Sequence, residues 1–102
     1  MVLNMPSTAS VKTPPPLTSA QIRAARALIR WTAEDLAENS TVSVTTIRRA
    51  ELRQNETVLT RVNDSVIRRA LEDAGVEFID ENGSGGPGVR LRKQIPTRPA
   101  RG

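Results

Sequence analysis

The stretch that decides the fold spans residues 32–51 and reads TAEDLAENSTVSVTTIRRAE. Thr32 is a good N-cap and two acids follow it, so a helix is expected to begin here and to end near Asn39. The polar residues after Asn39 favour a turn. Ser43 is then expected to cap another helix from Val44 to about Arg53. Two helices joined by a turn of about three to four residues, the second with its own cap, form the sequence pattern of a helix-turn-helix.

The helix expected over residues 44–53 has two different faces when it is viewed down its axis. One face carries small and apolar side chains that suit packing on the preceding helices: Thr46, Ile47 and Ala50. The other face carries the side chains that are expected to meet solvent: Val44, Thr45, Arg48 and Arg49. No protein core needs two adjacent arginines. The outward face is therefore either a solvated basic surface or a surface that contacts nucleic acid.

The flanking segments complete a mostly α fold of four to five helices followed by a C-terminal β-hairpin. Helices are expected over residues 19–31 and 62–74, the second starting near Asn63 or Asp64. Two strands of opposite charge, 76–81 and 89–93, enclose a glycine-rich loop and favour antiparallel pairing. The chain is thus expected to divide into a disordered N-terminal arm (1–17), a helical domain (18–75), a hairpin (76–93) and a disordered basic tail (94–102).

The composition argues against several classes of function. The 102 residues contain no His, no Cys and no Tyr, which removes the commonest general base, thiolate chemistry and the commonest metal ligands. We therefore expect no enzyme activity, no cofactor and no metal. No apolar stretch approaches the ~20 residues that span a bilayer. A cytoplasmic, nucleoid-associated location without membrane contact is the expectation.

The charged residues are segregated along the chain. Thirteen of the 15 basic residues are Arg, which suits phosphates and guanine edges but is also favoured by a high-GC genome. Residues 18–61 carry seven Arg against five acids, residues 62–86 carry two Arg against six acids, and residues 87–102 carry five basic residues and no acid. A polyanion is therefore expected to meet the first half and the end of the chain and to avoid the acidic middle.

Two blocks of this sequence resemble a known family. Residues 21–51, with ALEDAGVEFIDENG at 70–83 and GPGVRLR at 86–92, resemble the Cro/phage-repressor-like helix-turn-helix transcriptional regulators, also called the XRE family. The second block resembles a short stand-alone branch of that family. From the start of the first block to the end of the last, the resemblance spans about three-quarters of the chain. The resemblance implies a repressor-like domain that binds double-stranded DNA.

The resemblance also implies roles for individual residues. The positions that face base edges are Val44, Thr45, Arg48 and Arg49. The positions that contact phosphate are Thr32, Ser43 and Arg53. Arg26 and Glu51 correspond to a structural ion pair between the first helix and the helix of residues 44–53. Three positions depart from the family pattern: Thr41 replaces the usual turn Gly, Ser40 replaces an apolar residue and Ala33 replaces a polar one.

Two functions remain open from the sequence. The first is a transcriptional regulator that acts as a symmetric homodimer on an inverted repeat, with the hairpin as the dimerisation element because a lone hairpin has free edges. The second is a protein-binding module, resembling an antitoxin or an antiactivator, that uses the same fold for a protein partner. The long polar arms and the departures at the turn favour the second function.

Overall fold

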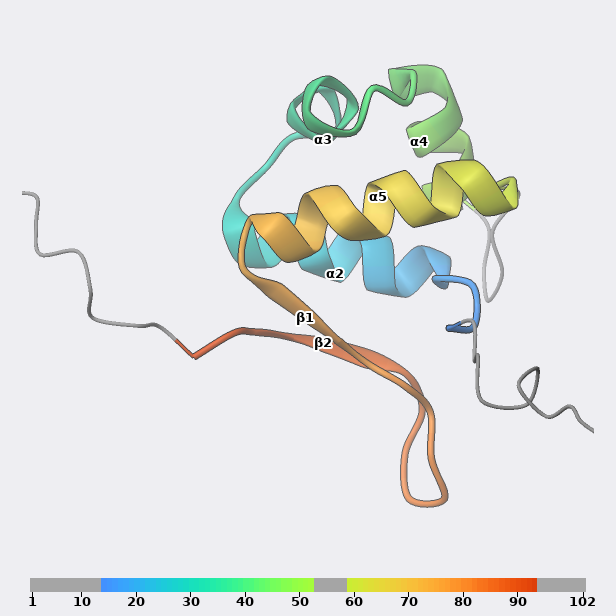
Figure 1. Ribbon diagram of the computed structural model, residues 1–102, viewed down its shortest axis with the longest axis vertical. Helices are drawn as coiled ribbons and strands as arrows, with labels where there is room; N and C mark the ends of the chain where they lie inside the picture. Colours follow the sequence, from blue (N-terminus) through green and yellow to red (C-terminus); the bar gives the residue numbers. More distant parts are fainter. Residues whose placement is uncertain (1–13, 53–58, 94–102) are drawn as a thin grey trace, which may run out of the picture.

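The structure is a computed structural model, and it describes residues 14–52 and 59–93. Within these ranges the chain forms four helices and one two-stranded antiparallel sheet (Figure 1). The elements are α2 (Ser19–Ile29), α3 (Ala33–Ser40), α4 (Val44–Leu52), α5 (Arg61–Asp73), β1 (Val76–Ile79) and β2 (Gly88–Leu91). This confirms a mostly α fold followed by a hairpin. The expected tail, Arg53 and the arm before residue 14 lie outside the described residues.

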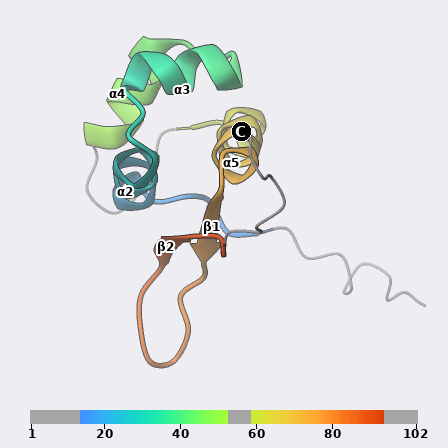
Figure 2. The same ribbon diagram turned by 90° about the vertical axis from the view of Figure 1, so that its left-hand side faces the viewer.

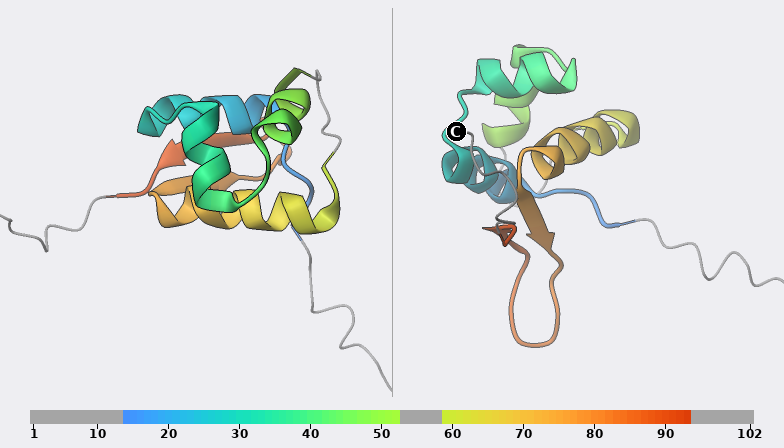
Figure 3. Two further views of the ribbon diagram at one scale, coloured as in Figure 1. Left: turned by 90° about the horizontal axis from the view of Figure 1, so that it is seen from above. Right: turned by 60° about the vertical axis from the view of Figure 1, so that its left-hand side comes forward.

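The elements stack in three layers. Helices α2 and α5 lie side by side in the middle, α3 and α4 cover one side of this pair, and the hairpin covers the other (Figures 1 and 2). Seen from above, α3 crosses over α2 and α5 (Figure 3, left). The core draws fully buried side chains from all three layers: Ile22 and Ala25 of α2, Leu36 of α3, Ile47 and Ala50 of α4, Ile67 and Leu71 of α5, and Val76 of β1. Burial of these apolar side chains provides the main driving force for folding.

Hydroxyl side chains cap all four described helices, among them α2, α3 and α5. Thr18 and Thr32 each form a capping box with the residue three positions later, which satisfies otherwise free backbone N–H groups. The cap of α5 is Thr60, whose hydroxyl accepts from the Asn63 N–H at 3.0 Å. The expected helix over residues 62–74 is therefore confirmed to within one residue at each end, and its cap lies at Thr60. A capping side chain bonds the third helical residue, and here Asn63 is that residue.

Helix α2 ends at Ile29, two residues before the expected end. Arg30 takes the left-handed conformation, with φ of 59°, and its N–H donates to the Ala27 carbonyl. The Trp31 N–H then donates back to the Arg26 carbonyl at 3.0 Å. A left-handed residue closes the last turn in this way and prevents the helix from continuing.

The hairpin has the predicted antiparallel pairing, with Glu77 opposite Arg90. The Arg90 guanidinium donates two hydrogen bonds to the Glu77 carboxylate, each 3.1 Å long. The amide of Gln21 on α2 donates to the Gly88 carbonyl at 3.1 Å and to the Ile79 carbonyl at 3.4 Å. Because Ile79 and Gly88 face each other in the register, this one side chain fastens the loop end of the hairpin to α2.

Residues 14–17 pack on the domain, although the sequence placed them in a disordered arm. The Leu17 side chain is only 1% exposed, and its backbone N–H donates to the Asp64 carboxylate at 2.8 Å. The Arg68 guanidinium donates to the Pro15 carbonyl at 2.9 Å and lies over the Phe78 ring, 5.2 Å from its centroid. The boundary at residue 17 is therefore wrong, because these contacts join residues about fifty positions apart that a local pattern does not reveal.

Two further features of the described residues bear on function. None of their helices has both the length and the apolar character that crossing a bilayer requires. Their acidic residues also do not gather into a group that could hold a metal ion.

Candidate nucleic-acid interface

The connection from α3 to α4 is a short turn held by hydrogen bonds. Thr41 adopts φ of 65°, and its N–H donates to the Ala37 carbonyl at 2.8 Å. The left-handed region costs a non-glycine residue about 1–2 kcal/mol, so Thr41 makes the turn less stable than a glycine would. Ser40 is buried, and its hydroxyl accepts from the Val42 N–H at 3.2 Å. Thr41 and Ser40, two of the three departures from the pattern of the resembled family, therefore fit a regular turn.

Ser43 caps α4 as the sequence predicts. Its hydroxyl oxygen accepts from the Thr46 N–H at 3.1 Å and donates to the Thr46 hydroxyl at 3.0 Å. The side chain is exposed at the start of the helix, where backbone N–H groups attract anions. A phosphate contact at Ser43 stays a prediction.

The faces of α4 differ from the expected faces at one position. Ile47 and Ala50 are fully buried, whereas Thr45, Arg48 and Arg49 are exposed. Val44, which was expected to face outward, is half-buried and packs against the core. The reason lies in helix geometry, because side chains three positions apart share a face and Val44 precedes the buried Ile47 by three. Val44 also precedes the exposed Arg48 by four positions, so it lies at the border of the two faces, and its contact with a base edge stays a prediction.

The two adjacent arginines of α4 have different surroundings. Arg48 forms an ion pair with Glu34, which lies in the first turn of α3. Both side chains stay open to solvent, at 56% exposure for Arg48 and 63% for Glu34. The pKa of the Glu34 carboxyl is lowered, first by a hydrogen bond from its own backbone N–H and further by the Arg48 charge. Within the described ranges Arg49 has no ion-pair partner.

The exposed face of α4 continues to Leu52. This side chain is 82% exposed and lies seven positions after Thr45, so both are on the same side of the helix. A shallow hollow of about 290 Å³ lies beside it, lined by Arg23, Arg48, Glu51 and Leu52. The Arg23 guanidinium donates to the Glu51 backbone carbonyl. The sequence interpretation overlooked Leu52 and Arg23, and only the seven-residue spacing from Thr45 could have pointed to Leu52.

Arg26 and Glu51 form the ion pair that the resemblance implies. Arg26 Nε donates to Glu51 Oε2 at 2.7 Å, and Nη2 donates to Oε1 at 2.8 Å. A third bond runs from Arg26 Nη1 to the Trp31 carbonyl at 2.8 Å. The pKa of Arg26 is raised, chiefly by the hydrogen bond with Glu51. The pair ties α4 to α2 and so fixes which side of α4 faces outward.

Thr32 is poorly suited to the phosphate contact expected of it. Its backbone N–H donates to the Asp35 carboxylate at 2.9 Å, and its hydroxyl accepts from the Asp35 N–H at 3.0 Å. Glu34 adds a second carboxylate to this first turn. Two negative charges at the start of α3 repel a phosphate, so we leave Thr32 out of the proposed contacts. Arg53, the third expected phosphate contact, lies outside the described residues.

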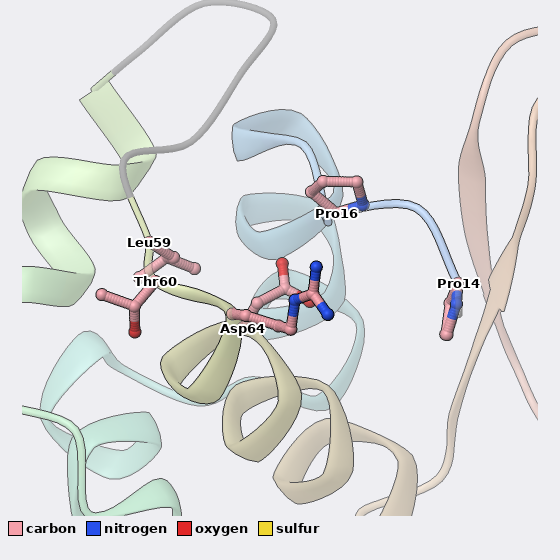
Figure 4. A pocket seen from close by; sticks show the side chains of 6 residues that line it. Pro14, Pro16, Leu59, Thr60 and Asp64 are labelled. Atoms are coloured by element: carbon pink, nitrogen blue, oxygen red, sulfur yellow. The ribbon is translucent and has the colours of Figure 1, made fainter. Parts of the chain in front are cut away.

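A separate pocket of about 220 Å³ lies at the start of α5 (Figure 4). Six residues line it: Pro14, Pro16, Leu59, Thr60, Arg61 and Asp64. The Asp64 carboxylate already accepts the Leu17 N–H, and the Thr60 hydroxyl caps α5. Asp64 and Thr60 are thus engaged in holding the fold, and the outward face of α4 remains the stronger candidate for a functional site.

In comparisons with known proteins, neither a protein-family model nor a curated protein sequence matches the chain. The resemblance to the XRE family therefore stays a prediction.

Proposed function

We propose that the chain is a sequence-specific DNA-binding transcription regulator in which α3 and α4 form a helix-turn-helix. In this proposal α4 enters the major groove, which is wide enough to admit a helix. One observation carries it: α4 buries Ile47 and Ala50 and leaves Thr45, Arg48 and Arg49 open to solvent. A short capped helix with two exposed adjacent arginines suits a groove lined by acceptors and phosphates.

The exposed side chains have the chemistry for the proposed contacts. An Arg guanidinium offers paired donors to guanine O6 and N7, and a good bidentate contact is worth about 1–3 kcal/mol of discrimination. The Thr45 methyl group suits a thymine methyl. Ser43 and the backbone N–H groups at the start of α4 suit a phosphate, which would set the register.

A single subunit offers few contacts, so we propose a symmetric homodimer on an inverted repeat. Its half-sites would lie about one helical turn apart, or roughly 34–36 Å. The hairpin is the proposed dimer element, because a two-stranded sheet leaves a free edge on each strand. It lies on the opposite side of α2 and α5 from α4 (Figure 2). Pairing through the hairpin would thus leave the outward face of α4 uncovered.

The test is selection of bound duplexes from random DNA, followed by affinity measurements on the selected duplex. The variant R48A/R49A removes both arginines from α4. The control R61A/R69A removes two exposed arginines from α5 and therefore changes the net charge equally. We expect the first variant to lose the sequence preference and the second to keep it. An unchanged preference in R48A/R49A would refute the proposed reading residues.

The alternative function, a protein-binding module of the antitoxin or antiactivator kind, is favoured by Leu52. A leucine this exposed on the same face as Arg48 suits an apolar contact with a partner protein. Under this alternative, L52S abolishes co-purification of a stoichiometric partner, and R49A has a smaller effect. Under the DNA-binding proposal, L52S leaves the preferred duplex sequence unchanged.

A further inference from the structure

The exposed arginines of α4 are adjacent in the sequence but differ in one contact. A carboxylate from another helix, Glu34 of α3, holds the Arg48 guanidinium, whereas Arg49 has no such partner among the described residues. The residues of the pair are 14 positions apart. Nothing in the packing of the core requires it, because both side chains lie more than half in solvent.

We propose that Glu34 is a specificity-determining positioning residue, which orients Arg48 for a guanine edge and leaves Arg49 to bind backbone phosphate. This inference rests on the proposed function. Its physical basis is that Arg48 and Arg49 have the same side chain but different neighbours, so they suit different ligands. A guanidinium beside a carboxylate is a poor ligand for phosphate, since the carboxylate repels the phosphate oxygens.

The geometry leaves Arg48 able to read a base while it is held. Its Nη2 donates to Glu34 Oε2, and the remaining N–H groups of the guanidinium stay available. An arginine that is already oriented loses less side-chain freedom when it binds guanine, so less of the contact energy is spent on ordering it.

Glu34 is expected to affect binding in the DNA complex and not the stability of the free protein. An exposed ion pair in water contributes little to folding, so E34Q is expected to unfold at nearly the same temperature as the natural chain. In a groove from which water is displaced, the same pair interacts more strongly. The role of Glu34 therefore appears in base discrimination, which a merely structural role would not change.

The test uses the duplex that the natural chain selects from random DNA. Each guanine of its half-site is replaced in turn, and the loss of affinity gives the discrimination at that position. R48A identifies the guanine that Arg48 reads, because discrimination disappears there. We compare E34Q with E38Q, which removes the same charge from an exposed position one turn further along α3.

We expect both variants to bind random duplex more tightly, because each lacks one charge that repels DNA. Only E34Q should lose discrimination at the Arg48 guanine, by about three- to tenfold, which corresponds to the cost of immobilising one long side chain. In an R48A background, E34Q should change the preference no further.

A loss of discrimination in E34Q no larger than in E38Q would overturn the inference and leave the proposed function standing. A further change in base preference when E34Q is added to R48A would also overturn it, because Glu34 would then act without Arg48. If the natural chain selects no preferred sequence, both the inference and the proposed function fail.

Discussion

Substitution of Glu51 by Gln tests whether the ion pair to Arg26 holds α4 in place. Gln has nearly the same shape but no charge. Its amide NH2 group donates a hydrogen bond where a carboxylate oxygen of Glu51 accepted one. Arg26 and Glu51 are only 22% and 10% exposed, so water cannot fully replace the lost partner. The remaining bond from Arg26 to the Trp31 carbonyl orients the guanidinium without neutralising it.

Breaking a fully buried pair by removing one partner costs about 3–5 kcal/mol. Because about a fifth of Arg26 lies in solvent, we expect E51Q to lower the free energy of unfolding by about 2–3 kcal/mol. Urea unfolding followed by circular dichroism and by the fluorescence of Trp31, the sole tryptophan, measures this change. The control E38Q removes an exposed charge and should change the free energy by less than about 0.5 kcal/mol.

A double-mutant cycle with R26A and E51A isolates the interaction itself. We expect a coupling free energy of about 2 kcal/mol, within the range for residues in direct contact. Additive effects of R26A and E51A, or a loss in E51Q as small as in E38Q, would refute the reasoning.

Three further substitutions test other parts of the fold. T41G removes a side chain from a left-handed turn position and should raise the free energy of unfolding by up to about 1 kcal/mol. A lower free energy of unfolding, measured in urea, would contradict this. L17A should lower it by about 3 kcal/mol, as for other buried leucines, and no loss would mean that residue 17 is not anchored. The pKa of the Glu77 carboxyl is lowered, first by the hydrogen bond from Arg90 and then by its charge. The contribution of the Glu77–Arg90 ion pair to stability is therefore present above the usual Glu pKa. It is lost as the pH falls through the lower pKa that Glu77 has in the folded state. The difference in melting temperature between the natural chain and E77Q should narrow from pH 6 to pH 3, and a constant difference would contradict this assignment.

The elements of the fold could be predicted where local chemistry determines them. Thr32 and Ser43 begin helices as predicted, because a cap depends on residues within three positions. The strand pairing was also predictable from the charges of 76–81 and 89–93, since opposite-charge pairs stabilise neighbouring strands.

The remaining features depend on contacts that no local pattern contains. Leu17 is buried by a helix about fifty residues further along the chain, so composition alone placed it in the arm. The pairing of Arg48 with Glu34 requires the packing angle of α3 against α4. Val44 lies at the border of the two faces of α4, because it precedes the buried Ile47 by three positions and the exposed Arg48 by four, and its half-burial depends on how α4 packs on the core.

The most direct test of the account is an NMR titration of the ¹⁵N-labelled full chain with the selected duplex. We predict the largest shifts at the backbone amides of Thr45, Arg48 and Arg49 and at the Arg49 side-chain Nε–H. The hairpin tip, residues 82–85, should stay unchanged, because it lies on the far side of the molecule from α4 (Figure 1). Shifts concentrated in the hairpin or α5, with the α4 resonances unmoved, would contradict the claim that α4 contacts DNA.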